Sequence, residues 1–292
     1  MKKFAAAMLA GAMVLSFGMT AMAEDDVLVM ATNAEFPPYE YHEGDEIVGI
    51  DAEIAALIAE ELGMTLEIED MAFDSVLAAV QSGKADMAMA GITVTEERKM
   101  VVSFSDTYTK ATQMIIVAED SEIAGPDDLT GKTIGVQLGT TGDIYVEDVE
   151  DAAIERYSKG FEAVQALIQG KVDAVVIDGE PAKVFVEENE GIKLLDEAFT
   201  EEEYAIAVAK ENEELLEKIN GALAALKESG EFDKVIAKYI GDDAEAAAEA
   251  ETEAAEEETE TVTEAAAETE TVTEAVTEAA AETEAVTEAV TE

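Results

Sequence analysis

Arg98 closes the stretch AGITVTEER, residues 90–98, in a chain where 17 Lys and Arg face 69 Asp and Glu. A guanidinium binds a carboxylate through two parallel N–H bonds, a geometry that the lysine ammonium does not supply. Gly91 and Thr93 lie just before Arg98 and offer backbone and hydroxyl groups. These residue types at this spacing favour a cradle for an anionic group.

Two further segments carry complementary chemistry. GTTG, residues 139–142, precedes an expected helix start, where free backbone N–H groups attract anions. Asp178 follows the apolar run DAVVI and offers a carboxylate to a cation. An α-amino acid carries a carboxylate and an ammonium on one carbon, so an anion cradle close to a carboxylate would suit it.

Each of these features also has a structural alternative. Arg98 could pair on the surface with one of the two glutamates before it. Asp178 could cap a helix formed by GEPAKVFVEE. Phe36 and Phe73 could both be core residues. The residue pattern by itself leaves these alternatives open.

Short apolar strands alternate with amphipathic helices between Asp25 and Asp243. Residues 51–63 predict a helix with Asp51 as its N-cap and Gly63 just past its end. The other expected elements of this half are strands VLVMATN (27–33), TLEIEDM (65–71) and KADMAMAG (84–91) and helix SVLAAVQSG (75–83). This order predicts an α/β fold with a mainly parallel sheet flanked by helices on both faces.

A second pass through the same plan begins near Thr133. VQSGKADMAMAG aligns with LIQGKVDAVVID at a spacing of 87 residues, and each copy contains Gly-Lys-x-Asp. Gly91 and Asp178 then lie at the carboxyl ends of equivalent strands, outside which open α/β sheets bind ligands. Two lobes with a cleft between them are therefore expected, although βα units can resemble each other by chance. A last helical stretch, residues 212–240, carries an apolar stripe expected to pack in the core.

The two ends of the chain differ from this body. Residues 1–23 are typical of a signal peptide, with Lys2 and Lys3, an apolar run and small residues before the expected cleavage site. Residues 244–292 contain only Ala, Glu, Thr and Val and predict an acidic, low-complexity, disordered tail, or alternatively a tether at the cell surface.

The chain has no cysteine, so core packing alone must hold an exported fold. Its formal charge of −52 argues against nucleic acid or an anionic lipid surface as partner.

Several motifs occur together in a fixed order between about Val27 and Gly241. They are ATNAEFPPYEY, VGIDAEIAALIAEELG, AVQSGKAD, AGITVTEERK, VSFSDTY, DDLTGKTIGVQLGTTGD and GKVDAVVID. With the signal, this series resembles the polar-amino-acid family of extracellular solute-binding proteins of ABC importers. The resemblance implies a two-lobed periplasmic-binding-protein fold, with hinge strands near Thr112–Val117 and Tyr204–Ala209. Its implied lobe 1 is 24–112 with 208–243, and its lobe 2 is 113–207.

The resemblance also implies roles for individual residues. Arg98, with the N–H groups of Thr93 and Thr141, would hold an α-carboxylate. Asp178, the Gly91 carbonyl and the Thr93 hydroxyl would hold an α-ammonium. The remaining implied ligand-binding residues are Phe36 and Phe73 on either side of the ligand side chain, and Asn33, Ala90, Gln137 and Thr140 at its far end.

AGITVTEER is most similar to the glutamine-binding members, but three positions depart from them. Asn33 stands where an acid is common, Gln137 where they carry a basic residue, and Ile177 where they carry histidine. Asn33 offers no formal charge to a guanidinium or ammonium, which lowers the expectation for arginine or lysine. Glu35 would restore that expectation if it points inward. His42 is expected in a surface turn.

The implied function is capture of a free polar amino acid outside the cytoplasm, in the periplasm or at the cell surface. The protein would act as a monomer and deliver its ligand to an ABC permease in the cytoplasmic membrane. No cofactor or metal is expected. No catalytic residue is expected either, since the sequence offers no nucleophile with an evident base. A sensory or surface ligand-binding module, or a dehydratase on the same fold, are the alternatives.

Overall fold

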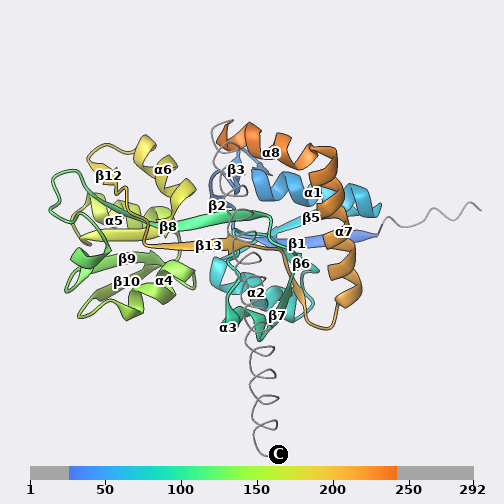
Figure 1. Cartoon of the computed structure of the whole chain (residues 1–292), viewed down its shortest axis with the longest axis horizontal. Helices are drawn as coiled ribbons and strands as arrows, with labels where there is room; N and C mark the ends of the chain where they lie inside the picture. The colour runs from blue at the N-terminus through green and yellow to red at the C-terminus, as the bar shows by residue number, and fades with distance from the viewer. Residues whose placement is uncertain (1–25, 242–292) are drawn as a thin grey trace, which may run out of the picture.

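The computed structural model describes residues 26–241, which form two lobes, each built around a β-sheet (Figure 1). The predicted signal, residues 1–23, and the predicted acidic tail, residues 244–292, lie outside the described residues. Among the helices of the described part, none combines the length and the apolar character needed to cross a membrane. The lobe containing β1 is called the first lobe here, and the other is the second lobe.

The first sheet has the strand order β5-β1-β6-β14-β7. Its strands are β1 (Val27–Thr32), β5 (Thr65–Asp70), β6 (Met87–Ala88), β7 (Val102–Phe104) and β14 (Ala207–Ala209). Only β14 runs against its neighbours. The sheet is therefore mainly parallel, as predicted.

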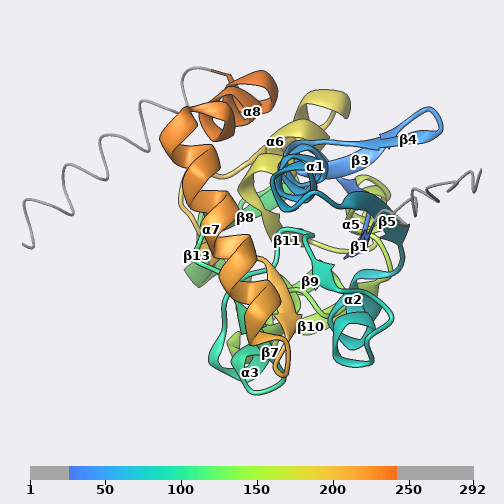
Figure 2. The ribbon, with the colours of Figure 1, turned by 90° about the vertical axis from the view of Figure 1, so that its right-hand side faces the viewer.

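Helices cover both faces of the first sheet, because residues of β1 point alternately to its two sides. Leu28 and Met30 pack with α1 (Ile50–Leu62), α7 (Glu213–Ser229) and α8 (Glu231–Ile240), which lie together in Figure 2. Ala31 packs on the other face with α2 (Phe73–Gln81). The stretch predicted to be helical over 212–240 is two helices separated by Gly230, which has a φ of 74°. Its apolar stripe lies against the core as expected, with Leu215, Ile219, Leu223 and Leu226 buried and Leu216 partly buried.

The second sheet has the order β10-β9-β11-β8-β12, and β13 also pairs with β8. Its strands are β8 (Thr109–Ala118), β9 (Thr133–Gln137), β10 (Ala153–Tyr157), β11 (Ala174–Asp178), β12 (Ile192–Leu194) and β13 (Thr200–Tyr204). Only β8 runs against its neighbours. Helices α5 (Gly160–Ile168) and α6 (Gly179–Glu188) pack on one face, and η1 (Pro126–Leu129) and η2 (Val146–Asp148) pack on the other.

The chain passes from the first sheet to the second between β7 and β8 and returns between β13 and β14. β8 and β13 are antiparallel partners and run between the two lobes in Figure 1. Near the return, Val94 N–H donates to the Glu203 carbonyl at 3.0 Å, and Ala205 N–H donates to the Ile92 carbonyl at 3.1 Å. These bonds attach the end of β13 to the segment that leads to Arg98. The boundary residues and hinge motion expected from the sequence stay predictions.

The start of α1 corrects one expectation. Gly49, not Asp51, occupies the N-cap position, and the helix begins at Ile50. A Cβ on Gly49 would lie 2.2 Å from the Tyr39 carbonyl oxygen, so the chain needs glycine there. The Asp51 side chain is turned inward and buried. Gly63 ends the helix in the left-handed conformation, as predicted.

A small third sheet of the first lobe was not anticipated. It has the order β2-β3-β4, formed by Glu35–Phe36, Glu40–Glu43 and Glu46–Val48. His42 lies in β3 and not in a turn, although its side chain is exposed as expected for a surface position. This sheet brings Glu35 and Phe36 to the side of the first lobe that faces the second.

Candidate ligand-binding site

A cavity lies between the two lobes, and residues of both sheets line it. The eleven residues predicted from the sequence all contribute to its lining: Asn33, Phe36, Phe73, Ala90, Gly91, Thr93, Arg98, Gln137, Thr140, Thr141 and Asp178. Five further lining residues were not predicted: Glu40, Gln113, Val176, Ile177 and Tyr204. The sequence motifs therefore meet in space, although they are spread over both halves of the chain.

Arg98 lies in the short helix α3 (Glu96–Lys99), whose N-cap Thr95 accepts a hydrogen bond from the Arg98 N–H at 3.1 Å. Its side chain bonds to both lobes: Nη1 donates to the Thr93 carbonyl at 2.9 Å, and Nη2 donates to the Gly139 carbonyl at 3.2 Å. Arg98 is 7% exposed, which excludes the alternative of a surface ion pair. The guanidinium carbon is also 5.7 Å from the centre of the Phe73 ring. A guanidinium has five donors, so others are left for an anion.

Asp178 is the last residue of β11 and is 2% exposed. One carboxylate oxygen accepts from the Glu180 N–H at 3.4 Å, so Asp178 does cap α6, as the structural alternative proposed. The other oxygen accepts a hydrogen bond from the Tyr204 hydroxyl. The residue thus caps a helix and lines the cavity at once. Burial raises the pKa of Asp178 to about 8, because the charged form loses its hydration.

Glu202, a buried carboxylate next to the cavity, was not among the residues predicted from the sequence. Its Oε2 accepts from the Thr93 hydroxyl at 2.9 Å and from Gln113 Nε2 at 3.0 Å. The Thr93 hydroxyl also lies 3.4 Å from that of Thr141 in the second lobe. Burial lowers the pKa of Arg98, and the Glu202 charge acts in the opposite direction. Strand alternation could have singled out Glu202, since it shares a face of β13 with Tyr204.

The surroundings of Gly91 leave no room for a side chain at this position. Its φ is +54°, and a Cβ would lie 2.9 Å from the Phe36 ring and 3.1 Å from the Tyr204 ring. Its N–H donates to Asp51 at 3.0 Å, and the Tyr108 hydroxyl donates to the same carboxylate at 2.9 Å. The inward Asp51 therefore anchors the segment before Arg98.

Two buried acids, Asp51 and Glu40, lie close together next to the segment that contains Gly91. Burial raises the pKa of Asp51 to about 6. Glu40 lines the cavity and is 1% exposed. Burial, followed by the nearby charge of Asp51, raises the pKa of Glu40 well above its ordinary value. Burial thus shifts both acids toward their protonated forms.

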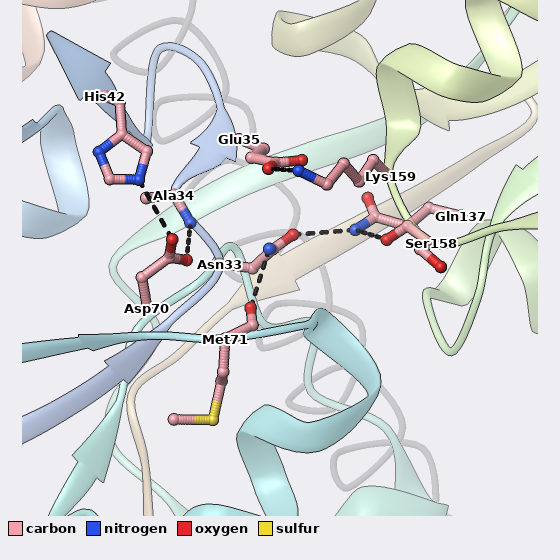
Figure 3. Close-up of polar contacts among 9 residues, drawn as sticks. All are labelled: Asn33, Ala34, Glu35, His42, Asp70, Met71, Gln137, Ser158 and Lys159. Atoms are coloured by element: carbon pink, nitrogen blue, oxygen red, sulfur yellow. Dashed lines mark hydrogen bonds and ion pairs between the residues drawn. The ribbon is translucent and has the colours of Figure 1, made fainter. Parts of the chain in front are cut away.

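The other end of the cavity is closed by contacts between side chains of opposite lobes (Figure 3). Gln137 Nε2 donates to Asn33 Oδ1 at 2.9 Å, and Asn33 Nδ2 donates to the Met71 carbonyl at 2.9 Å. Lys159 forms an ion pair with Glu35 beside them. The Thr140 hydroxyl donates to the Gln137 carbonyl at 2.8 Å and caps the helix α4 (Thr141–Tyr145).

Comparison with known proteins places this architecture in one family. Residues 28–242 match the model of the bacterial extracellular solute-binding proteins, family 3. The chain is 34% identical over 217 residues to the arginine-binding extracellular protein ArtP of Bacillus subtilis (strain 168), covering 73% of this chain and 85% of that protein.

Two solved structures of an ancestral arginine-binding protein are also similar. The structure with bound arginine is 42% identical, has a TM-score of 0.71, and covers 74% of this chain and 98% of its own. The structure with bound glutamine has the same identity and coverage, with a TM-score of 0.69. The family match extends across nearly all described residues and both lobes. The chain therefore belongs to the bacterial extracellular solute-binding proteins, family 3.

Proposed function

We propose that this protein captures a free polar amino acid outside the cytoplasm and delivers it to an ABC importer. One observation carries the proposal: the Arg98 guanidinium and the Asp178 carboxylate, from opposite lobes, line the same buried cavity. A zwitterion presents the two opposite charges that this pair needs. The solute-binding family supports binding and transport over the sensory and dehydratase alternatives.

In this proposal, Arg98 and the N–H groups of Thr93 and Thr141 bind the α-carboxylate. Asp178, the Gly91 carbonyl and the Thr93 hydroxyl bind the α-ammonium. The Thr93 hydroxyl suits this role because it already donates to Glu202, which leaves its lone pairs to accept from a cation. Phe36 and Phe73 then contact the apolar part of the ligand side chain.

Binding in this cavity is linked to the approach of the lobes. Arg98 reaches Gly139, Thr93 reaches Thr141, and Asn33 reaches Gln137 across the interface. A ligand that bonds to both sides adds its binding free energy to these contacts and so favours the closed arrangement. Micromolar affinity needs about 8 kcal/mol, which charge-assisted bonds shielded from water together with aromatic contact can supply.

The class of side chain is polar, and arginine and glutamine are the first ligands to test. The relatives compared above bind arginine, and the ancestral protein also has a glutamine-bound structure. Asn33 and Gln137 offer amide donors and acceptors at the side-chain end. Glu35 offers a carboxylate beside them, already paired with Lys159.

Isothermal titration calorimetry of the exported chain with a panel of L-amino acids tests the proposal. We expect micromolar or tighter binding of at least one polar amino acid, and a loss of at least 100-fold in affinity in Arg98→Ala, in the range for one partner of a buried charge pair. Lys99→Ala is the matched control, because Lys99 is the next residue but bonds to Glu96 at the surface. Affinity unchanged by Arg98→Ala would refute the assigned site.

A further inference from the structure

An ion pair joins the two lobes next to the side-chain end of the cavity. Glu35 belongs to β2 of the first lobe, and Lys159 immediately precedes α5 of the second. Their side chains are 23% and 42% exposed, so the pair is partly shielded from water. Figure 3 shows it alongside the amide contact between Asn33 and Gln137.

Neighbouring residues place this pair against the cavity, although neither member lines it. Glu35 directly precedes Phe36, a lining residue. Lys159 follows Ser158, whose carbonyl accepts from Gln137 Nε2 at 3.4 Å. A Cβ built on Gly160, the next residue, would lie 3.5 Å from Gln137 Oε1. The charges of Glu35 and Lys159 therefore lie beside the amides of Asn33 and Gln137, which would meet the end of a ligand side chain.

We propose that Lys159 is a specificity-determining residue that lowers the affinity for cationic side chains relative to neutral ones. Its ammonium already neutralises Glu35, and it presents a like charge to any guanidinium or ammonium that reaches Asn33 and Gln137. A neutral amide or ureido group meets no such repulsion and finds amide partners. This inference rests on the proposed amino-acid site.

The other charges near the pair do not replace Glu35. Asp70 accepts from His42 at 3.1 Å and from the Ala34 N–H at 3.0 Å, so its oxygens are engaged away from Lys159 (Figure 3). Glu162 is partly buried in the first turn of α5, and it acts on Lys159 only through its charge and more weakly than Glu35 does. Glu35 is thus the acid whose negative charge Lys159 neutralises.

L-Arginine and L-citrulline are the sharpest pair of ligands, because they have nearly the same shape and differ by one positive charge. We would measure both dissociation constants by calorimetry, with competition titrations for the weaker ligand. Any change in lobe closure affects both ligands alike and cancels in their ratio. The informative quantity is therefore the Kd of citrulline divided by the Kd of arginine.

Lys159→Met should raise this ratio by about tenfold, because Glu35 becomes free to attract the guanidinium. Glu35→Gln should lower the ratio by a similar factor, since Lys159 is left without its counter-charge. The double variant should return the ratio to within about twofold of the wild-type value. Lys218→Met on α7 is the matched control: its side chain is 55% exposed and pairs with Glu214, and its loss should leave the ratio unchanged.

The outcomes separate this inference from the proposed function. If both ligands bind and neither single substitution changes the ratio beyond twofold, Lys159 has no role in specificity. A fall in the ratio for Lys159→Met would also overturn the inference, because it would mean that Lys159 assists cation binding. If no amino acid binds the wild-type chain, the proposed function itself fails.

Discussion

The Tyr204 hydroxyl donates a hydrogen bond to the Asp178 carboxylate, so the last residue of β13 bonds to the last residue of β11. Tyr204 also forms a backbone bridge with Thr93 of the first lobe. One tyrosine at the return between the sheets thus contacts the segment expected to bind the carboxylate of the ligand and the acid expected to bind its ammonium. Tyr204 therefore couples the position of the Thr93 segment to the charge of Asp178.

Tyr204→Phe should weaken amino-acid binding by about tenfold, because a hydrogen bond to a charged group contributes about 1.5–3 kcal/mol and Asp178 loses this donor. The ring remains, so packing against Tyr39 and Tyr108 is retained. Calorimetry measures the change, and Tyr41→Phe in β3 serves as the control. Equal affinities for the two variants would mean that the hydroxyl does not support Asp178.

Binding should depend on pH through Asp178. Burial raises its pKa to about 8 without ligand, and an ammonium at the same site lowers that pKa by favouring the carboxylate. Below pH 8 the acid must therefore release a proton when ligand binds, and affinity should fall as pH decreases, by up to about tenfold per unit.

Calorimetry at pH 7 in buffers of different ionisation enthalpy measures this release directly. We expect close to one proton released per ligand bound. Asp178→Asn should bind weakly and release none, because it has no carboxyl group to titrate. Proton release that persists in this variant would assign the titration to another group.

The stability of the ligand-free protein should change with pH in the opposite sense. The folded pKa of Asp178 is about 8, whereas an unfolded aspartate titrates near the ordinary value of 3.8. Between these values the folded state binds more protons than the unfolded state, so the free energy of unfolding falls as pH rises. Asp178→Asn removes this loss and should raise the melting temperature at pH 8.5 by roughly 5 °C.

Thermal unfolding of ligand-free protein followed by circular dichroism tests this at pH 5 and pH 8.5. Asp45→Asn, in the exposed turn between β3 and β4, controls for the loss of one acid from a strongly negative chain. A stabilisation by Asp178→Asn that is no larger at pH 8.5 than at pH 5 would contradict the assignment of burial as the cause.

The alternation of strands and helices was predictable because it depends on local apolar periodicity, which sequence displays directly. The N-cap of α1 was not, since choosing between Gly49 and Asp51 depends on contacts with Tyr39 and with Gly91, 40 residues away in the chain. Long-range bonds of this kind leave no local signal. An acid next to a helix start therefore looks the same whether it caps the helix or lies buried beneath it.

The residues in and next to the cavity also differ in how far the sequence could predict them. Residues in recognisable motifs, such as Arg98 in AGITVTEER, were named from the sequence and line the cavity. Glu202 was missed because three consecutive glutamates precede Tyr204 and composition does not distinguish them. The pairing of β13 with β8 turns Glu202 inward and leaves Glu201 and Glu203 in water, so the alternation of the strand up to Tyr204 is the one sequence signal that separates the three.

That difference gives a matched prediction for Glu202. Glu202→Gln keeps the size of the side chain but removes the negative charge of the carboxylate, whose Oε2 accepts from the Thr93 hydroxyl and from Gln113. Affinity for the amino acid should fall by about tenfold, since the hydroxyl loses its fixed orientation. Glu201→Gln, the same chemical change one residue earlier on the strand, should have no effect. Parallel titrations of the two variants decide the point, and equal affinities would leave Glu202 without a role in binding.

Gly91→Ala should weaken binding strongly through steric conflict, in addition to the stability that it loses through backbone strain. At a φ of +54° an added Cβ would meet the Phe36 ring at 2.9 Å and the Tyr204 ring at 3.1 Å, and both rings line the cavity. Gly83→Ala isolates the strain, because Gly83 has a φ of +69° and nothing within 4 Å of an added Cβ. Both variants should lose about 1 kcal/mol of stability from the left-handed backbone. Only Gly91→Ala should displace the two rings and lower affinity by about 100-fold or more in calorimetry, the scale of loss that a misplacement of about 1 Å causes where orientation is critical. Unchanged affinity in Gly91→Ala would show that the rings can move aside without disturbing the groups that bind the ligand.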